Sequence, residues 1–187
     1  MKIVKIRKAR KEDASAVTEL LYDMLGSIAR SHTAATTNEE ALLRLKAFIL
    51  SEKNRYSYHH ITVAEVDEKV VGLMLCYEGS MLQTLYEPVK RFVRAKLNNP
   101  AWEIDIETEH GDYYIDSLCV DEAYRGKGIG TALLNVAKQE AKKRKMFLSL
   151  NVEYNNVEAK KLYQRIGFQE HKTIFIDKKP FFYMKTA

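Results

Sequence analysis

The pattern of apolar and polar positions in the N-terminal third predicts one strand followed by two helices. Ile3 to Arg7 alternates charged and apolar residues, as a half-buried strand does. Asp13 stands where it can cap a helix whose apolar positions, from Val17 to Ile28, recur at helical spacing. Thr37 and Glu40 have the spacing of a capping box, which predicts a second helix with no strand before it.

The next signals predict a hairpin and a further helix. Ile61 to Val66 and Val70 to Tyr77 are β-rich runs separated by three residues, the length and chemistry of a hairpin turn. After them, Pro88 is suited to the first turn of a helix that Asn98 to Pro100 would stop. We therefore expect an antiparallel pair of strands and then a helix.

The segment from Glu103 to Glu109 alternates carboxylates with apolar or small residues. This alternation predicts an edge strand with Ile104 and Ile106 turned inward. Its carboxylates would form a solvated negative face. A second interpretation is a negative wall that attracts a cationic substrate.

The last third alternates strands and helices. Its expected elements are a strand from Tyr113 to Val120, a glycine-rich turn from Arg125 to Gly130 with a helix after it, a strand from Phe147 to Val152, a helix opened by Asn156 and ended by Gly167, and two closing strands near Phe168 to Ile176 and Phe181 to Lys185. This order suits an α/β (α+β) fold with a mixed, largely antiparallel sheet of about seven strands and helices on both faces.

Length and composition indicate one domain. The chain has 187 residues, of which 46% are hydrophobic, enough for one sizeable core and too few for a second full domain. We expect a single domain over 1–187, with an inserted segment over 79–112 before the strand that starts at Tyr113.

Charge and hydropathy exclude several classes of protein. The formal net charge is +5, but Lys and Arg are scattered along the chain without a basic and aromatic cluster, which disfavours a nucleic-acid-binding module. No apolar run approaches the roughly 20 residues of a membrane span, and the N-terminus lacks the apolar stretch of a signal peptide. A cytoplasmic location is therefore expected. Cys76 and Cys119 lie inside apolar strands without metal-ligand spacing, so we interpret both as reduced core residues and expect no metal.

The glycine-rich turn is the first candidate for ligand binding. Arg125-Gly126-Lys127-Gly128-Ile129-Gly130-Thr131 follows a strand and opens a helix, whose free N–H groups and positive dipole end suit a phosphate. Alternating glycines alone are a weak signal. A dinucleotide-binding motif would lie near the start of a parallel domain, and the lysine of a nucleoside-triphosphate loop is missing.

Two motifs around this turn resemble those of a known family. Leu118 to Leu134, which contains the turn, is similar to the cofactor-binding motif of the GNAT superfamily of acetyl-CoA-dependent N-acetyltransferases. Asn156-x-x-Ala159-x-x-Leu162-Tyr163-x-x-x-Gly167-Phe168 resembles the next motif of that family, in the right order. The detailed resemblance covers Tyr113 to Phe168.

The resemblance implies where acetyl-CoA binds. The backbone N–H groups of the turn would hold the pyrophosphate, and the pantetheine arm would lie between two splayed central strands, bonded to the main chain of Leu118 and Val120. A backbone N–H near Val120 would polarise the thioester carbonyl. The implied cofactor-binding residues are Leu118, Cys119, Val120, Arg125, Gly126, Lys127, Gly128, Ile129, Gly130, Thr131, Asn156 and Tyr163.

Tyr163 and Asp116 are the candidate catalytic residues. Tyr163 corresponds to the family tyrosine that protonates the departing thiolate, although a packed aromatic ring is the alternative. Asn156 corresponds to a pantetheine contact and is equally a plain helix cap. Strand alternation places Tyr114, Asp116 and Leu118 on one face unless a bulge intervenes, so Asp116 ranks first as the base that deprotonates the amine.

Other groups around the expected site leave the base open. Glu78, Glu107 and His110 flank the same region. Relatives that acetylate ribosomal protein N-termini have a glutamate base where this chain has Asn151, so their mechanism does not carry over. Cys119 lies on the opposite face from Leu118, which disfavours it as a nucleophile.

The resemblance implies direct attack of an amine on acetyl-CoA in a ternary complex, without an acyl-enzyme. The expected acceptor is a small-molecule or peptide amine, cationic in character. A non-catalytic acyl-CoA sensor on the same fold is the alternative function. The oligomeric state stays open, with a homodimer as one option.

Overall fold

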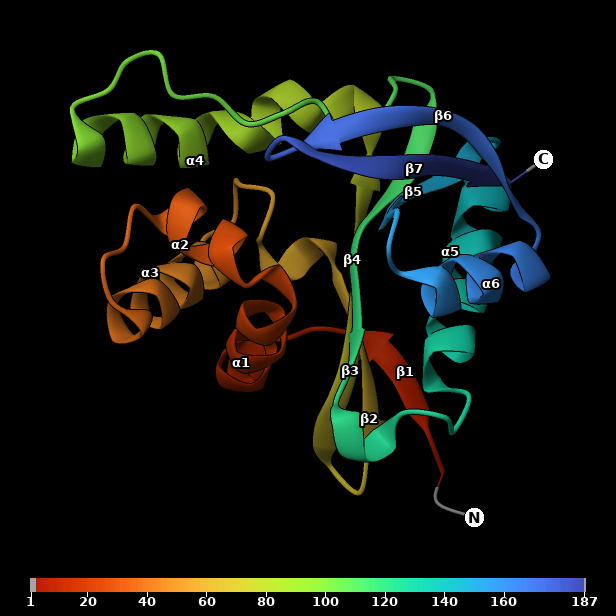
Figure 1. Ribbon diagram of the computed structural model, residues 1–187. Coiled ribbons are helices and arrows are strands. Elements are labelled where there is room, and N and C mark those ends of the chain that lie inside the picture. Colours follow the sequence, from red (N-terminus) through yellow and green to blue (C-terminus); the bar gives the residue numbers. More distant parts are fainter. Residues whose placement is uncertain (1–2, 187) are drawn as a thin grey trace.

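The computed structural model describes residues 3–186 and is built on one seven-stranded sheet (Figure 1). The strands lie in the order β1-β2-β3-β4-β5-β7-β6. Their bounds are β1 Lys5–Lys8, β2 Ile61–Val66, β3 Lys69–Glu78, β4 Asp112–Val120, β5 Phe147–Glu153, β6 Phe168–Ile176 and β7 Lys179–Thr186. All neighbours are antiparallel except β4 and β5, which confirms the expected mixed sheet.

Six α-helices cover the two faces of this sheet. They are α1 Ala14–Leu25, α2 Ser27–Thr33, α3 Asn38–Leu50, α4 Leu82–Leu97, α5 Ile129–Arg144 and α6 Val157–Ile166. Figure 1 shows α1 to α4 on one side of the sheet and α5 with α6 on the other. Each side has its own buried apolar cluster, one centred on residues such as Leu21 and Leu73, the other on residues such as Met74 and Leu133. None of the helices in residues 3–186 is long and apolar enough to cross a membrane.

The two central strands diverge. β4 and β5 pair only from Asp112 with Phe147 to Ile115 with Leu150. Beyond that point β4 stays on β3 as far as Val120, whereas β5 pairs with β7. The edge of β4 that faced β5 is therefore open in its second half, which is the splayed strand pair that the resemblance implied.

A β-bulge in β4 lies at the point of divergence. Leu75 on β3 pairs with Ser117 and Cys76 pairs with Ile115, so Asp116 has no partner across the strand. The extra residue reverses the alternation beyond it. Leu118 therefore packs on the α5 side and Cys119 on the α1 side, whereas the simple alternation would have placed Leu118 with Tyr114 and Asp116.

The helix ends predicted in the N-terminal part are partly confirmed. Thr37 accepts the N–H of Glu40 and caps α3 as predicted. Asp13 does precede α1 but makes no cap bond, because its carboxylate accepts the N–H of Arg10 and the guanidinium of Arg7 instead. The helix expected to continue to Ile28 breaks at Gly26, whose φ of 54° is left-handed, and α2 starts there.

The inserted segment differs most from the prediction. Helix α4 begins at Leu82, so Pro88 lies inside it rather than in its first turn. The earlier turn forms because Leu82, Leu85 and Tyr86 are buried, which offsets the backbone bond that Pro88 cannot make. The expected helix stop is confirmed, since Asn98 caps α4 in a left-handed conformation.

The edge strand expected from Glu103 to Glu109 does not form. Ile104 is buried, but Ile106 is 67% exposed and Glu107 only 7% exposed, the reverse of the expected facing. Glu103 pairs with Lys90 and Arg94, and Glu109 pairs with Lys172 and Lys185. The segment is therefore held by side-chain ion pairs and is not a free negative wall.

Candidate active site

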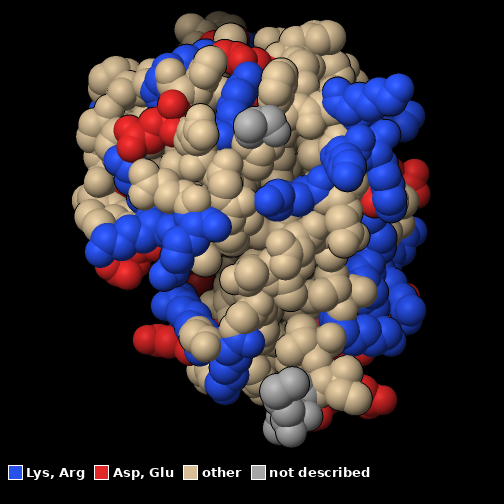
Figure 2. All heavy atoms as spheres, turned by 90° about the vertical axis from the view of Figure 1, so that its right-hand side faces the viewer, with Lys and Arg blue, Asp and Glu red and all other residues tan. Residues whose placement is uncertain are grey.

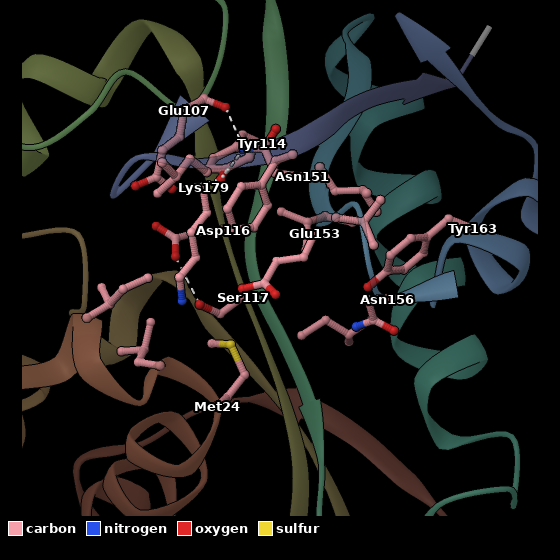
Figure 3. A pocket seen from close by; sticks show the side chains of 18 of the residues that line it. Met24, Glu107, Tyr114, Asp116, Ser117, Asn151, Glu153, Asn156, Tyr163 and Lys179 are labelled. Atoms are coloured by element: carbon pink, nitrogen blue, oxygen red, sulfur yellow. Dashed lines mark hydrogen bonds between the residues drawn. The ribbon is translucent and has the colours of Figure 1, made fainter. Parts of the chain in front are cut away.

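A pocket opens where β4 leaves β5 (Figure 3). Its volume is about 380 Å³, and it lies between the bulged half of β4, the end of β5, the junction of α1 with α2, and α6. Asp116 and Ser117 come from β4, Glu153 comes from β5, and Tyr163 comes from α6 (Figure 3). The β6–β7 turn closes another side through Ile176, Lys179 and Phe181.

The glycine-rich turn lines a separate groove. Gly126 and Gly128 have φ values of 73° and 78°, which favour glycine, and a Cβ at either position would point into open space. Gly128 is the N-cap residue of α5 and has no side chain to cap it, so the N–H groups of the first turn are free for a ligand. The groove has a volume of about 530 Å³ and is lined by Val120, Tyr124, Arg125, Gly126, Gly128, Ile129, Gly130, Thr131, Glu158, Ala159, Leu162 and Arg165.

The charged side chains of the turn are held locally. Arg125 donates through Nε to the carbonyl of Val120 at 3.1 Å, and Lys127 donates to the carbonyl of Ala123 at 2.8 Å. The ammonium of Lys127 also lies 4.9 Å from the centre of the Tyr124 ring. Lys127 does not line the groove, so backbone groups rather than this side chain face a ligand there.

Positive charge surrounds this side of the molecule. Figure 2 shows the face beside α5 and α6, where Lys and Arg outnumber Asp and Glu. The last turn of α5 alone carries Lys142, Lys143 and Arg144. A positive face raises the local concentration of a polyanion such as a phosphate-rich cofactor.

Tyr163 and Asn156 stand at the end of the pocket next to α6 (Figure 3). Asn156 caps α6 by accepting the N–H of Ala159 at 3.2 Å, and it also lines the pocket. The Tyr163 ring packs edge-on against Phe168, with centroids 5.9 Å apart. Burial raises the pKa of Tyr163 to about 12, so its hydroxyl is protonated at neutral pH and able to donate.

The opposite end of the pocket holds a buried ion cluster centred on Arg55. Its guanidinium donates to Asp116 through Nε at 3.0 Å and Nη2 at 2.6 Å. The same carboxylate accepts the hydroxyls of Tyr77 at 2.6 Å and Ser117 at 2.9 Å. The side chains of Arg55 and Asp116 are each 2% exposed. Asp116 is thus fully engaged by donors, and its role as the base stays a prediction.

Glu107 is the second carboxylate on Arg55. It accepts Nη1 and Nη2 at 3.2 Å and the hydroxyl of Tyr114 at 2.9 Å. Burial raises the pKa of Glu107, and the neighbouring charge of Asp116 adds to this although Arg55 opposes it. Of the three flanking candidates, only Glu107 joins Asp116: Glu78 pairs with Arg144, and His110 does not line the pocket.

Asn151 connects the two central strands beside this cluster. Its amide nitrogen donates to the hydroxyl of Tyr114 at 2.9 Å and to the carbonyl of Glu107 at 2.8 Å. Its buried oxygen accepts no hydrogen bond from the described residues. Asn151 therefore lines the pocket with its unpartnered oxygen buried.

Sequence reasoning did not identify Arg55, Tyr77 or Glu153 as site residues. Arg55 lies in the loop before β2, with no motif around it to indicate that it reaches Asp116. For Glu153 the sequence did contain a signal. This residue follows Asn151 by two positions, which places it on the same face of β5.

Comparison with known proteins identifies the family. The family model described as "Acetyltransferase (GNAT) family" matches residues 21–168. The spermine/spermidine N(1)-acetyltransferase of Bacillus subtilis (strain 168) is 32% identical over 104 residues, which are 51% of this chain and 67% of the relative. A crystal structure of an N-acetyltransferase from Staphylococcus aureus Mu50 superposes with a TM-score of 0.83 at 26% identity, covering 97% of this chain and 100% of the other. A second structure, of an acetyltransferase, superposes with a TM-score of 0.81 at 29% identity over 98% of both chains.

The glycine turn, the splayed strands and these similarities agree with one another. The chain belongs to the GNAT family and is an N-acetyltransferase.

Proposed function

We propose that this enzyme binds acetyl-CoA along the open edge of β4 and transfers its acetyl group to the amine of a cationic small molecule or peptide. The observation that carries the proposal is the position of the two cavities. The glycine-turn groove and the pocket with the acidic cluster meet the same strand, at Val120 and Leu118 respectively. A thioester bound where β4 and β5 diverge would be accessible from both the groove and the pocket.

The residues of the groove fit acetyl-CoA. Free N–H groups at the start of α5, with no Cβ above Gly126 or Gly128, suit a pyrophosphate. The unpaired half of β4 suits an extended arm that bonds like an added strand, with Leu118 and Val120 at its edge. Asn156 and Tyr163 then stand at the reacting end.

The acceptor end of the pocket suits a donor-rich cation. Its charged lining residues are Arg55, Lys179, Glu107, Asp116 and Glu153, so carboxylates outnumber cations. Because the B. subtilis relative is named for spermine and spermidine, we take polyamines as the first acceptors to try.

Tyr163 and the acidic cluster divide the proton transfers. Tyr163 protonates the leaving thiolate, and the end of the pocket that contains Asp116 receives the proton of the amine. Cys119 takes no part, because burial raises the pKa of its thiol to about 12 and it packs on the α1 side of β4. The reaction is therefore a direct transfer in a ternary complex, and a non-catalytic sensor is not favoured. A homodimer and a cytoplasmic location stay predictions.

A thermal-shift and calorimetric experiment tests the cofactor site. Acetyl-CoA should raise the Tm of the wild-type protein, because a ligand that binds only the folded state stabilises it. Gly128→Asp should abolish the shift by placing a carboxylate at the pyrophosphate. Gly128→Asn is the matched control, since it has the same size and backbone strain without the charge, and it should bind more tightly than the Asp variant. Binding by folded Gly128→Asp within a few fold of wild type would move the cofactor off this turn.

A screen of amines with acetyl-CoA tests the transfer. Spermidine, spermine, amino acids and short peptides are compared by the release of free thiol. We expect turnover with at least one polyamine and weaker turnover with amines that carry a carboxylate. Cofactor binding without turnover on any amine would favour the sensor.

A further inference from the structure

We propose that Glu107 takes the ammonium proton of the acceptor, from a carboxylate pair with Asp116 that shares the single guanidinium of Arg55. This inference rests on the proposed transfer to an amine. It assigns the proton acceptor inside the acidic end of the pocket to a residue of the inserted segment rather than to β4.

The pair holds one more negative charge than its arginine can balance. Arg55 contacts Asp116 at 2.6 Å and Glu107 at 3.2 Å, and all three side chains are at least nine-tenths buried. The phenols of Tyr56, Tyr77, Tyr86 and Tyr114 also face Glu107. Like charges that share a site cannot both ionise without cost, so such a pair binds either a cation or a proton.

Other nearby cations do not remove this charge. His32 lies in the small cavity behind Glu107, but burial and the charge of Arg55 keep its pKa well below the ordinary value, so the ring is neutral. Lys179 lines the pocket from the β6–β7 turn, is exposed, and makes no ion pair with Glu107 or Asp116 among the contacts of residues 3–186. The uncompensated negative charge of the pair therefore faces the pocket, where the acceptor amine would enter.

Hydrogen bonding distinguishes the two carboxylates. Asp116 accepts four bonds, three of them from Arg55 and Tyr77 at 2.6 to 3.0 Å. Glu107 accepts longer bonds of 3.2 Å from Arg55 and one from Tyr114 at 2.9 Å. Donors to a carboxylate stabilise its charged form, so Glu107, which has the longer bonds, is the carboxylate that takes the proton. The raised pKa of Glu107, caused mainly by burial, agrees with this assignment.

The proton transfers balance as follows. Glu107 carboxylate removes one proton from R–NH₃⁺, which leaves the nitrogen lone pair free and Glu107 neutral. The nitrogen forms a bond to the acetyl carbon while the carbon–sulfur bond breaks and its electron pair goes to sulfur. Tyr163 gives its proton to that sulfur and recovers one from the nitrogen. Glu107 later releases its proton to water, so the net products are the amide, the thiol and one proton.

Carboxyl titration tests the pair without any substrate. The side-chain carbons of Asp and Glu are followed by ¹³C NMR from pH 3 to pH 9 in the whole protein. We expect one carboxyl to titrate above the ordinary glutamate value of about 4.3, and this signal to be missing in Glu107→Gln. In Asp116→Asn the same signal should move to lower pH, because the repelling anion is gone.

Two results would overturn the assignment. One is a raised titration that survives in Glu107→Gln and disappears in Asp116→Asn, which would make Asp116 the proton site. The other is a folded wild-type protein in which no carboxyl titrates above the ordinary glutamate value. Circular dichroism and Tm establish that each variant is folded. Should Asp116→Asn not fold, Glu107→Gln alone decides, since it leaves the ion pair of Arg55 with Asp116 intact.

Kinetics on spermidine, or on whichever amine the screen finds, provide the second readout. Glu107→Gln should lower kcat/KM by about 10²- to 10⁴-fold near pH 7 and recover as the pH approaches the pKa of the amine. Glu78→Gln is the matched control outside the pocket and should behave as wild type. A Glu107→Gln variant within a few fold of wild type, with an unchanged pH profile, would overturn the inference and leave the acetyl transfer standing. No turnover by wild-type protein would contradict the proposed function, while the titration still decides the protonation of the pair.

Discussion

Tyr163 lines the pocket, and its ring packs on Phe168, so the roles of its hydroxyl and its ring can be separated by mutation. Tyr163→Phe removes the hydroxyl and keeps the packing. Because burial raises the pKa of Tyr163 to about 12, the wild-type residue is a proton donor at neutral pH. We expect kcat to fall by about 10²- to 10⁴-fold with little change in acetyl-CoA binding, measured by stopped-flow thiol release and calorimetry.

Cys119→Ala is the control for this experiment. Cys119 lies in the second half of β4, but its raised pKa makes the thiol a poor nucleophile, so turnover should remain near the wild-type rate. A Tyr163→Phe variant with wild-type kcat, once chemistry is shown to be rate-limiting, would leave Tyr163 as a packing residue.

Single residues were predictable from sequence where a motif surrounds them. Gly126, Gly128, Asn156 and Gly167 have the conformations or cap bonds expected from their positions. Arg55 was not, because its importance comes from a contact with Asp116, 61 positions away. The sequence also does not show that Asp116 is a bulge residue, since a bulge is a property of two paired strands.

Gly79 is required where the inserted segment packs back onto the sheet. A Cβ at this position would lie 1.9 Å from the carbonyl oxygen of Glu109. Because this oxygen belongs to the backbone, no side-chain movement relieves the clash. Gly79→Ala should therefore lower the free energy of unfolding by about 1–3 kcal/mol, as overpacking does. Gly111→Ala is the matched control in the same segment, because a Cβ there meets nothing within 4 Å.

Chemical denaturation of both variants checks this prediction. Gly111→Ala should stay within about 0.5 kcal/mol of wild type. Because Glu107 lies two residues before Glu109, Gly79→Ala should also reduce turnover more than acetyl-CoA binding. Equal stability of the two variants would show that the segment does not depend on this close approach.

Elements were predictable where a local signal and burial agree. The hairpin forms as predicted, but its turn is the two residues Asp67 and Glu68 rather than three, because Lys69 already belongs to β3. Both turn residues have positive φ, as a two-residue connection requires. The alternation from Glu103 to Glu109 was misleading, because this segment pairs with no strand within residues 3–186 and the ion pairs of Glu103 and Glu109 fix the chain instead. Periodicity alone does not include such long-range partners.

The whole-molecule arrangement followed from the order of elements, which indicated a mixed sheet between two layers of helices. The divergence of β4 from β5 did not follow from any local pattern. Each strand reads as regular in sequence, and the gap opens because β4 stays paired with β3 beyond its bulge while β5 stays paired with β7 on its other edge, from Ser149 to Glu153. That feature was expected only through the family resemblance.

Buried tyrosines link the stability of the whole molecule to alkaline pH. Burial raises the pKa of seven of the eleven tyrosines: Tyr56, Tyr77, Tyr86, Tyr113, Tyr114, Tyr163 and Tyr183. In the unfolded chain these phenols lose their protons near pH 10, whereas in the folded protein they keep them. A group whose pKa is higher in the folded protein than in the unfolded chain contributes its full stabilisation at a pH below the unfolded pKa. This contribution is lost as the pH rises through the folded pKa. We therefore expect the free energy of unfolding to decrease slightly from about pH 8.5, where the unfolded chain begins to ionise Cys76 and Cys119, and to fall steeply above pH 10.

Urea unfolding at pH 8 and pH 11, with tyrosinate absorbance at 295 nm, measures both sides of this linkage. The seven tyrosines with raised pKa should ionise together with the loss of far-ultraviolet circular dichroism, in one cooperative step. Tyr77→Phe and Tyr114→Phe should each remove part of the pH dependence above pH 10, because a phenylalanine has no proton to lose. If all eleven tyrosines titrated near pH 10 while the circular dichroism stayed native, the two buried layers around the sheet would be more open to water than the structure indicates.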